Sequence, residues 1–308
     1  MDDLLYRAKL AEQVDRYEEM AEMMKMLVCT KRQPLTDEER SIFAVAFKNV
    51  SGERRAAWRK VLSIERQELR NAEAAGNETD RKEFEQRAAV ALDYRTQIES
   101  ELSLICNEVL ALLYNHLVPL SDPVLADQLS TIIAGTCEAG AAEDIAEKHP
   151  VEKQLEKLVD EIVKGAAGQP SSKESMVFWF KMAGDYRRFL AEVLMDGSER
   201  REAEAHKALQ AYTIASSIAR MYLTPSHPIR LGLSLNVSVF YFEILQMRTV
   251  ACRIAENSFN EAVAELDHLD GSCYQDSMLV MQLLKDNLRS WTATEQDDQE
   301  VPETSAKQ

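Results

Sequence analysis

Residues 35–59 read LTDEERSIFAVAFKNVSGERRAAWR. Thr36 is followed three residues later by Glu39. This is the pattern of a capping box, in which the two side chains bind backbone N–H groups at the start of a helix. Gly52 lies further along the stretch and costs a helix about 1 kcal/mol. The stretch nevertheless predicts one long helix that opens after Thr36 and passes through Gly52.

Helical periodicity extends outward from this stretch in both directions. Towards the N-terminus, apolar residues such as Leu10, Val14 and Tyr17 recur at spacings of three and four. Towards the C-terminus, a second long periodic stretch runs over 82–117 and is predicted to stop at Pro119 and Pro123. No alternating strand pattern of any length is present. The sequence therefore predicts an all-α protein.

Two segments depart from this regular pattern. Residues 121–175 are richer in Gly and Pro and contain only two short helical patterns. Their apolar patches at Val124-Leu125 and Leu155-Leu158 could pack against the helical body. The tail at 292–308 is polar and acidic, which predicts disorder. We expect a single helical domain over 1–291.

Composition bounds the class of protein. The chain has 308 residues and a formal net charge of −16, a balance that disfavours nucleic acid and anionic membranes as partners. No apolar run reaches about 18 residues, so no transmembrane helix is expected. The five cysteines lack metal-ligand spacing and indicate reduced thiols in the cytosol. No metal or cofactor is predicted.

No motif predicts catalysis. The five histidines are widely separated, and no phosphate loop, nucleotide-binding glycine pattern or nucleophile elbow occurs. Most carboxylates stand beside Lys or Arg, as on solvated helix faces. The chain is therefore not expected to be an enzyme.

Two pairs of cations could form a binding site. Lys48 and Arg55 are seven residues apart in one predicted helix, and Lys181 and Arg188 have the same spacing in another. Seven residues make two helical turns, so each pair projects from one face. Converging Arg and Lys side chains suit a phosphate dianion. The alternative is that all four are ordinary surface cations.

A second set of residues could form the walls of a groove. Its members recur at helical spacing in two later segments, and the apolar ones could equally belong to the core. The two asparagines offer both donors and an acceptor to an extended peptide backbone. The set comprises Asn236, Val239, Glu243, Leu279, Val280, Leu283, Asn287 and Trp291.

At these residues the sequence resembles the 14-3-3 family. The stretches that carry the resemblance are, in family order, YRAKLAEQVDRYEEM (6–20), 35–59 as quoted above, FKMAGDYRRFLAEV (180–193), SHPIRLGLSLNVSVFYFEIL (226–245) and DSMLVMQLLKDNLRSW (276–291). The resemblance implies a bundle of nine antiparallel helices, an amphipathic groove and a cup-shaped dimer. Residues 121–175 form an insertion relative to the family, between its fourth and fifth helices.

The resemblance also implies roles for individual residues. Lys48, Arg55 and Arg188 match positions that bind phosphate, and Asn236 and Asn287 match those that hold the ligand backbone. Lys181 and Glu243 match groove positions, and Val239, Leu279, Val280, Leu283 and Trp291 match the groove wall. The residues that match the dimer interface are Leu10, Val14, Arg16, Glu19, Leu62, Tyr94 and Glu101.

Two departures from the family pattern stand out. Phe189 follows Arg188 where the family has a tyrosine, so one hydroxyl donor to phosphate is missing. Such a bond to a charged group contributes about 1.5–3 kcal/mol. Gln97 stands where the family has the lysine that pairs with the acid matched by Glu19, so one ion pair between subunits is expected to be absent.

The resemblance implies a cytoplasmic, dimeric adaptor that binds phosphoserine or phosphothreonine segments of client proteins. The dimer would be a homodimer or a heterodimer with a related chain. The alternative is a divergent dimeric scaffold whose client binding is weakened or independent of phosphate. The insertion is either a tolerated surface elaboration, because long insertions cost little loop entropy, or an added docking surface or lid.

Overall fold

The computed structural model describes residues 2–135, 149–165, 169–194, 197–265 and 271–299. All regular structure in these ranges is helical, so the prediction of an all-α protein is confirmed. The described chain forms two compact units, which are treated separately below. The first contains 1–123 and 189–204, and the second contains 124–188 and 205–308.

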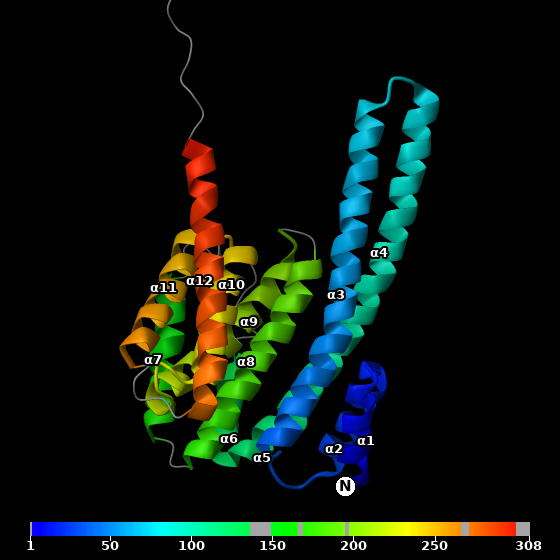
Figure 1. The fold of residues 1–308 in the computed structure, drawn as a ribbon. Helices are drawn as coiled ribbons and strands as arrows, with labels where there is room; N and C mark the ends of the chain where they lie inside the picture. The colour runs from blue at the N-terminus through cyan, green and yellow to red at the C-terminus, as the bar shows by residue number, and fades with distance from the viewer. Residues whose placement is uncertain (1, 136–148, 166–168, 195–196, 266–270, 300–308) are drawn as a thin grey trace, which may run out of the picture. The chain divides into compact units, whose positions relative to one another are not determined.

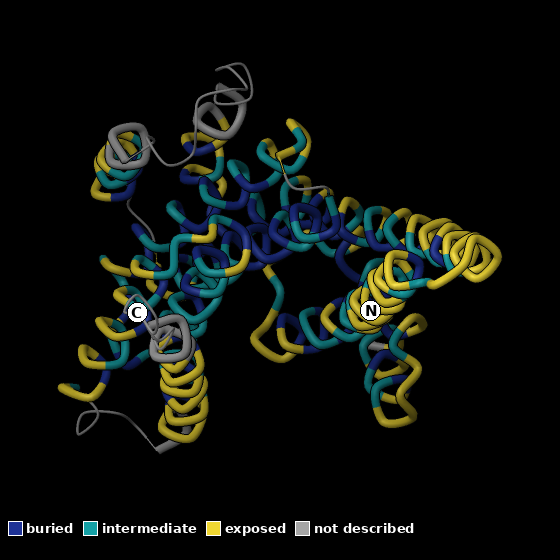
Figure 2. The backbone as a smooth tube through the Cα atoms, turned by 90° about the horizontal axis from the view of Figure 1, so that it is seen from above, coloured by how far each residue is buried: buried dark blue, intermediate teal, exposed yellow. Residues whose placement is uncertain are grey.

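The first unit is built around two long helices that pack side by side. They are α3 (Asp37–Ala74) and α4 (Glu78–Leu112), drawn in blue and cyan in Figure 1. The shorter helices α1 (Asp2–Gln13) and α2 (Tyr17–Thr30) pack against each other, and α2 also packs against α3. Buried and exposed residues alternate around the helices (Figure 2), as expected of amphipathic helices with one face in a core.

The start of α3 confirms the predicted capping box. The Thr36 side chain accepts a hydrogen bond from the Glu39 backbone N–H at 3.3 Å, and the Glu39 carboxylate accepts one from the Thr36 N–H at 2.7 Å. The helix then continues through Gly52 to Ala74, also as predicted. Because the cap satisfies two N–H groups that lack helical partners, it defines where α3 begins.

The predicted stop at Pro119 is wrong. After α4 the chain makes a π-helical turn at Leu113–Leu117 and then a short helix, α5 (Val118–Ser121). Pro119 sits in the first turn of α5, where a missing N–H costs little. The chain therefore stays helical for one more turn than the proline suggested.

The stretch Glu78–Ser121 is long and apolar enough to cross a membrane by length and composition. The core helix of a soluble protein satisfies the same criterion, so this is weak evidence for a membrane span. Leu102, Cys106, Val109 and Leu113 are all fully buried inside the first unit. Their burial accounts for the apolar character of this stretch.

The second unit contains α6 (Pro123–Gly135), α7 (His149–Gly165), most of α8 (Pro170–Val193) and of α9 (Glu199–Tyr222), α10 (Pro228–Glu243), α11 (Arg248–Glu265) and α12 (Gly271–Gln299). Helix α10 packs against α11 and α12, which also pack against each other (Figure 1). In the part of the chain that the structure describes, α5 adds a short helix, and α6 and α7 lie within the segment 121–175. Helix α12 extends past Trp291 to Gln299, into the segment expected to be disordered.

Helix α7, within the segment 121–175, is attached to α9. Arg220 of α9 donates to the Glu156 carboxylate at 2.7 Å and to Asp160 at 2.9 and 3.1 Å. Val159 and Val163 of α7 are fully buried. The predicted apolar patches are only partly correct: Leu125 is fully buried, but Val124 and Leu158 are exposed. The buried face of α7 therefore contains Val159, the residue after Leu158, and does not contain Leu158 itself.

Gly184 allows α8 and α9 to approach closely. A Cβ atom at Gly184 would lie 2.5 Å from ring carbons of Tyr212 in α9. Tyr212 is only 1% exposed, so its ring has little room to move. The absence of a side chain at Gly184 is therefore a packing requirement.

We expect Gly184→Ala to destabilise the protein by about 1–3 kcal/mol, the usual cost of overpacking a well-filled core. The gain in helix propensity from Gly to Ala, about 1 kcal/mol, opposes this cost but is smaller than a clash with a buried ring. Urea denaturation of the variant measures the change. Gly52→Ala is the matched control, because a Cβ there meets no atom within 4 Å. A Gly184→Ala variant as stable as Gly52→Ala would contradict the argument.

Candidate functional site

The second unit holds a buried polar cluster centred on Asp185 of α8. The Asp185 carboxylate accepts hydrogen bonds from the Tyr212 hydroxyl at 2.7 Å and from the Asn236 amide at 2.8 and 2.9 Å. It also accepts one from Lys181 at 3.0 Å and lies 3.5 Å from Arg188. Two cations thus share the Asp185 carboxylate at the centre of the cluster.

Three of the predicted site residues meet in this cluster. Lys181 and Arg188 project from one face of α8, as their spacing predicted, and Asn236 reaches Asp185 from α10. Glu243, at the end of α10, lies 3.9 Å from Arg188 and is partly exposed. Arg188 is 7% exposed, so its guanidinium is held within the protein and not spread into solvent.

The cluster shifts the pKa values of its members. Burial alone raises the pKa of Asp185, but Lys181, Arg188 and the Tyr212 hydroxyl outweigh it and hold that pKa below its usual value. Burial and the neighbouring Asp185 raise the pKa of Tyr212 well above that of a free tyrosine. Asp185 is therefore ionised and Tyr212 neutral at pH 7, which lets the hydroxyl donate to the carboxylate.

The raised pKa of Tyr212 predicts a loss of stability at alkaline pH. Because the unfolded tyrosine ionises near pH 10 and the folded one does not, stability is complete below pH 10 and falls as the pH rises towards the folded value. Between pH 10 and 11 this group should remove about 1 kcal/mol. Urea midpoints of wild type and Tyr212→Phe across this range isolate the effect. If the urea midpoints of the two proteins fell equally between pH 10 and 11, Tyr212 would not be the cause of the loss of stability.

The first unit holds the other predicted phosphate-binding residues on α3. Lys48 is exposed, and Arg55 is partly buried. The Arg55 guanidinium binds the Glu192 carboxylate at 2.7 and 2.8 Å, and its central carbon lies 3.9 Å from the centre of the Phe189 ring. Arg59 binds the other oxygen of Glu192 at 2.7 Å. Glu192 and the Phe189 ring therefore orient Arg55 through an ion pair and a cation–π contact.

The predicted groove wall on α12 divides into exposed and buried members. Leu279 and Leu283 are 64% and 44% exposed, whereas Val280 and Asn287 are half-buried. Trp291 is buried and stacks on Phe242 of α10, with ring centres 4.6 Å apart. The α10 residue Val239 is half-buried. Leu279 and Leu283 are thus the members available to contact a ligand.

The residues predicted for the dimer interface all lie in the first unit. Leu10, Val14 and Tyr94 are apolar and exposed by 43–63%, and Leu62 is half-buried. Within the chain, Arg16 pairs with Glu19, and Glu101 lies 3.8 Å from Arg54. Arg16, Glu19 and Glu101 therefore have partners within one protomer. That all seven residues form the dimer interface stays a prediction.

Sequence reasoning missed several residues that organise the site. Asp185 could have been found, because it stands four residues after Lys181 and three before Arg188, within reach of both on a helix. Tyr212 and Glu192 carry no comparable signal. The contact between Arg55 and Phe189 joins residues far apart in the chain, and it was not expected.

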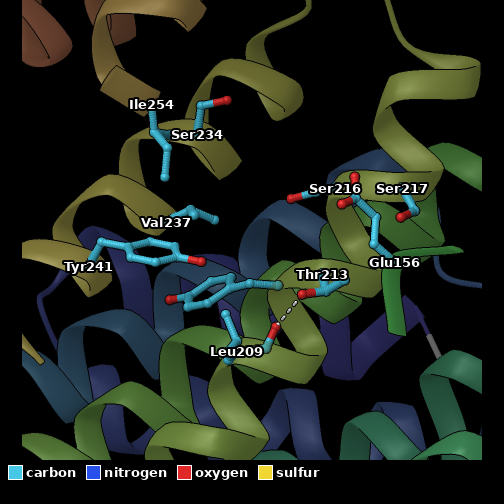
Figure 3. A pocket seen from close by; sticks show the side chains of 10 residues that line it. Glu156, Leu209, Thr213, Ser216, Ser217, Ser234, Val237, Tyr241 and Ile254 are labelled. Atoms are coloured by element: carbon cyan, nitrogen blue, oxygen red, sulfur yellow. Dashed lines mark hydrogen bonds between the residues drawn. The ribbon is translucent and has the colours of Figure 1, made fainter. Parts of the chain in front are cut away.

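A cavity of about 210 Å³ lies in the second unit, and Tyr212 is among the residues that line it. Figure 3 shows its mixed lining, with Glu156 of α7 beside Ser216 and Ser217 of α9. The Thr213 hydroxyl is occupied by a hydrogen bond to the Leu209 carbonyl at 2.9 Å. None of the predicted site residues lines this cavity. Among the described residues, no group of three His, Cys, Asp or Glu side chains could hold a metal ion.

The described residues thus combine helical structure with a buried Arg188, an Asn236 amide held by Asp185 and exposed leucines on α12. Comparison with known sequences identifies the class. The family described as "14-3-3 protein" matches residues 7–128 and 140–292, which is most of the chain. The gap between the two ranges falls inside the segment 121–175.

Curated relatives agree with this match. A "14-3-3-like protein" of Solanum tuberosum is 42% identical over 97% of this chain and 92% of its own length. A "14-3-3-like protein" of Pisum sativum is 42% identical over 99% of this chain and 95% of its own length. The "14-3-3 family protein artA" of Aspergillus flavus is 41% identical over 96% of this chain and 97% of its own length. The chain belongs to the 14-3-3 family. Members of this family are non-enzymatic adaptors for phosphorylated proteins.

Proposed function

We propose that this protein is a dimeric, cytoplasmic adaptor that binds phosphoserine or phosphothreonine segments of client proteins and thereby regulates their activity, location or interactions. Family membership supports the adaptor role. The observation that supports the proposal is the convergence of Lys181, Arg188 and the Asn236 amide on the buried Asp185 carboxylate. Lys and Arg side chains oriented in this way suit a phosphate dianion, which accepts charge-assisted hydrogen bonds from them.

In the proposed mechanism, Lys48, Arg55 and Arg188 bind the phosphate. Arg55 and Arg188 donate paired N–H groups and Lys48 adds a point charge. Glu192 holds Arg55 in place, so little side-chain entropy remains to be lost when the anion binds. Arg188 is oriented in the same way by Asp185 and Tyr212.

The peptide around the phosphorylated residue is proposed to bind in an extended form. Asn236 and Asn287 hold its backbone, while Lys181 and Glu243 contact polar groups beside it. Its apolar side chains lie on Leu279 and Leu283, which are exposed, next to Val239, Val280 and Trp291. Burial of apolar surface contributes about 25 cal/mol per Å² before the costs of ordering the peptide are subtracted.

Fluorescence anisotropy with a labelled Arg-Ser-x-phosphoSer-x-Pro peptide and its unphosphorylated twin tests the proposal. We expect micromolar or tighter binding of the phosphopeptide and at least a hundredfold weaker binding of the twin. Equal affinity for both peptides would sink the proposal. It would favour the second candidate, a dimeric scaffold with phosphate-independent clients, for which the missing hydroxyl at Phe189 is the motivating feature.

We expect Phe189→Tyr to tighten phosphopeptide binding by about tenfold, because the ring that supports Arg55 is kept and a hydroxyl donor to phosphate is added. Phe189→Leu removes the ring and should weaken binding instead. Anisotropy with the same phosphopeptide measures both changes. The unphosphorylated peptide is the control, since neither change should alter its affinity. A Phe189→Tyr variant with unchanged affinity would mean that the hydroxyl does not reach the phosphate.

The remaining parts of the proposal concern partners and chemistry. We infer a homodimer or a heterodimer with a related chain, held by Leu10, Val14, Leu62 and Tyr94 together with charged residues around them. A dimer engages two phosphosites at once and gains avidity. We propose no catalytic activity and no cofactor. We also propose no nucleic acid or membrane partner, because the net charge of −16 repels nucleic acids and anionic membranes.

A further inference from the structure

Three arginines line a depression on α3 that the proposed phosphate site does not use. The depression has a volume of about 340 Å³ and is lined by Arg59, Leu62, Ser63, Arg66 and Arg70. All five residues belong to one helix of the first unit. Three guanidinium groups therefore line one depression in a protein whose net charge is −16. Such a local concentration of positive charge favours binding of an anion.

The arginines continue the line of the cations already assigned to phosphate. Four arginines follow Lys48 along α3. Their distances from Lys48 are 7 residues for Arg55, 11 for Arg59, 18 for Arg66 and 22 for Arg70. These spacings are close to two, three, five and six full turns of an α-helix, so all five side chains project from one face of α3. We call this set the α3 cationic stripe. No acidic residue of α3 lies on this face between Lys48 and Arg70; Glu73 is the first beyond it.

The two halves of the stripe differ in how their charge is balanced. Glu192 binds both Arg55 and Arg59 and neutralises part of the first half. In the part of the chain that the structure describes, Arg66 has no ion pair or hydrogen bond, and Arg70 donates only to the neutral Gln67 amide, at 2.8 Å. Both arginines are exposed. The second half therefore carries positive charge that the described chain does not compensate.

We propose that Arg66 and Arg70 form a second anion-binding subsite, which takes an acidic continuation of the same client segment that carries the phosphorylated residue. The inference rests on the proposed function, because it deepens the specificity of that site. The partner chemistry is a cluster of carboxylates or a second phosphoryl group, which arginine forks bind in bidentate fashion. The Ser63 hydroxyl lines the same depression and offers a neutral donor.

The helix also sets the spacing between the two anionic groups. Arg66 lies 11 residues beyond Arg55, which corresponds to about 16 Å along the helix, and Arg70 lies about 22 Å beyond it. An extended peptide advances about 3.3 Å per residue. The acidic cluster of the client should therefore stand about five to seven residues from the phosphoserine.

The test uses two sets of four fluorescent peptides and the full-length protein. The peptides combine phosphoserine or serine with three glutamates or three glutamines, placed five to seven residues away, and a second set carries the same triplet on the other side of the phosphoserine. We expect the glutamate triplet on one side to tighten binding about tenfold at low ionic strength, a gain of about 1.4 kcal/mol. Replacing the triplet by a single second phosphoserine reports whether phosphate or carboxylate is preferred.

Two variants decide whether the stripe is responsible. Arg66→Gln with Arg70→Gln should abolish the gain from the triplet and leave the affinity for the glutamine peptide unchanged. Lys60→Gln is the matched control, because Lys60 is exposed on the same helix but projects from another face. It should keep the gain. The proposal fails if no triplet position tightens binding, if the gain survives in the double variant, or if Lys60→Gln removes it equally.

The design separates this inference from the proposed function. The effect of phosphoserine is measured on the glutamine peptides and reports the proposed function alone. The effect of the triplet is measured within each phosphorylation state and reports the stripe. A protein that prefers phosphoserine but ignores the triplet keeps its proposed function and loses the second subsite.

Discussion

Replacing Asp185 by asparagine is expected to destabilise the protein by about 3–5 kcal/mol. The carboxylate is 7% exposed and faces Lys181 at 3.0 Å and Arg188 at 3.5 Å. Asparagine keeps the size of the side chain but removes its charge, so the buried Arg188 would lose its Asp185 partner and keep Glu243, which is more distant at 3.9 Å. Removing one partner of a buried ion pair typically has a cost of this size. Urea denaturation monitored by circular dichroism measures the change.

The matched control for this substitution is Asp286→Asn in α12. Asp286 is exposed and accepts a hydrogen bond from Gln282 at 2.8 Å, so its loss should cost about 0.5 kcal/mol or less.

The dependence of the free energy of unfolding on pH in the acid range offers a second check. Because the folded pKa of Asp185 is lowered, its contribution is present above the unfolded value near pH 4 and is lost as the pH falls through the folded value. Asp185→Asn should lack this acid-sensitive component. An Asp185→Asn protein as stable as the control would show that the cluster is not structural.

Reversing the charge of Lys48 is expected to weaken phosphopeptide binding by about a hundredfold or more. Loss of a charge-assisted bond accounts for about 1.5–3 kcal/mol, and the new carboxylate would repel the phosphate. Lys48 is exposed, so Lys48→Glu should unfold at the same urea concentration as wild type. Anisotropy with the phosphorylated and unphosphorylated peptides measures the effect, which should be confined to the phosphorylated one.

Lys60→Glu provides the control for a general change in charge. It alters the net charge by the same amount on the same helix, but from a face that does not contain Lys48. We expect it to change the affinity by less than about threefold. Equal losses in the two variants would indicate that the phosphopeptide responds to the overall charge of α3. In that case Lys48 would not be part of the phosphate site.

Much of the candidate site follows from local spacing. Lys48 and Arg55, and likewise Lys181 and Arg188, are two turns apart, and helical geometry alone places each pair on one face. Asn236 was singled out because it shares a helix face with Val239 and Glu243 and offers donors and an acceptor, and the structure gives its amide a partner in Asp185. The environment of each cation could not be derived in this way. Glu192 stands 137 residues from Arg55 in the chain, and no local pattern relates the two.

The sequence by itself determined the class of fold and the ends of several helices, because these depend on interactions between neighbours in the chain. Capping at Thr36 satisfies backbone groups within three residues, and periodicity at spacings of three and four describes a single helix face. The tertiary structure decided what each face contacts. It placed the Tyr212 ring against Gly184, the Phe189 ring against Arg55 and Phe242 against Trp291. Burial, pKa shifts and the balance of charge at the site all depend on such contacts between distant residues, because desolvation and Coulomb energy are set by distance in space.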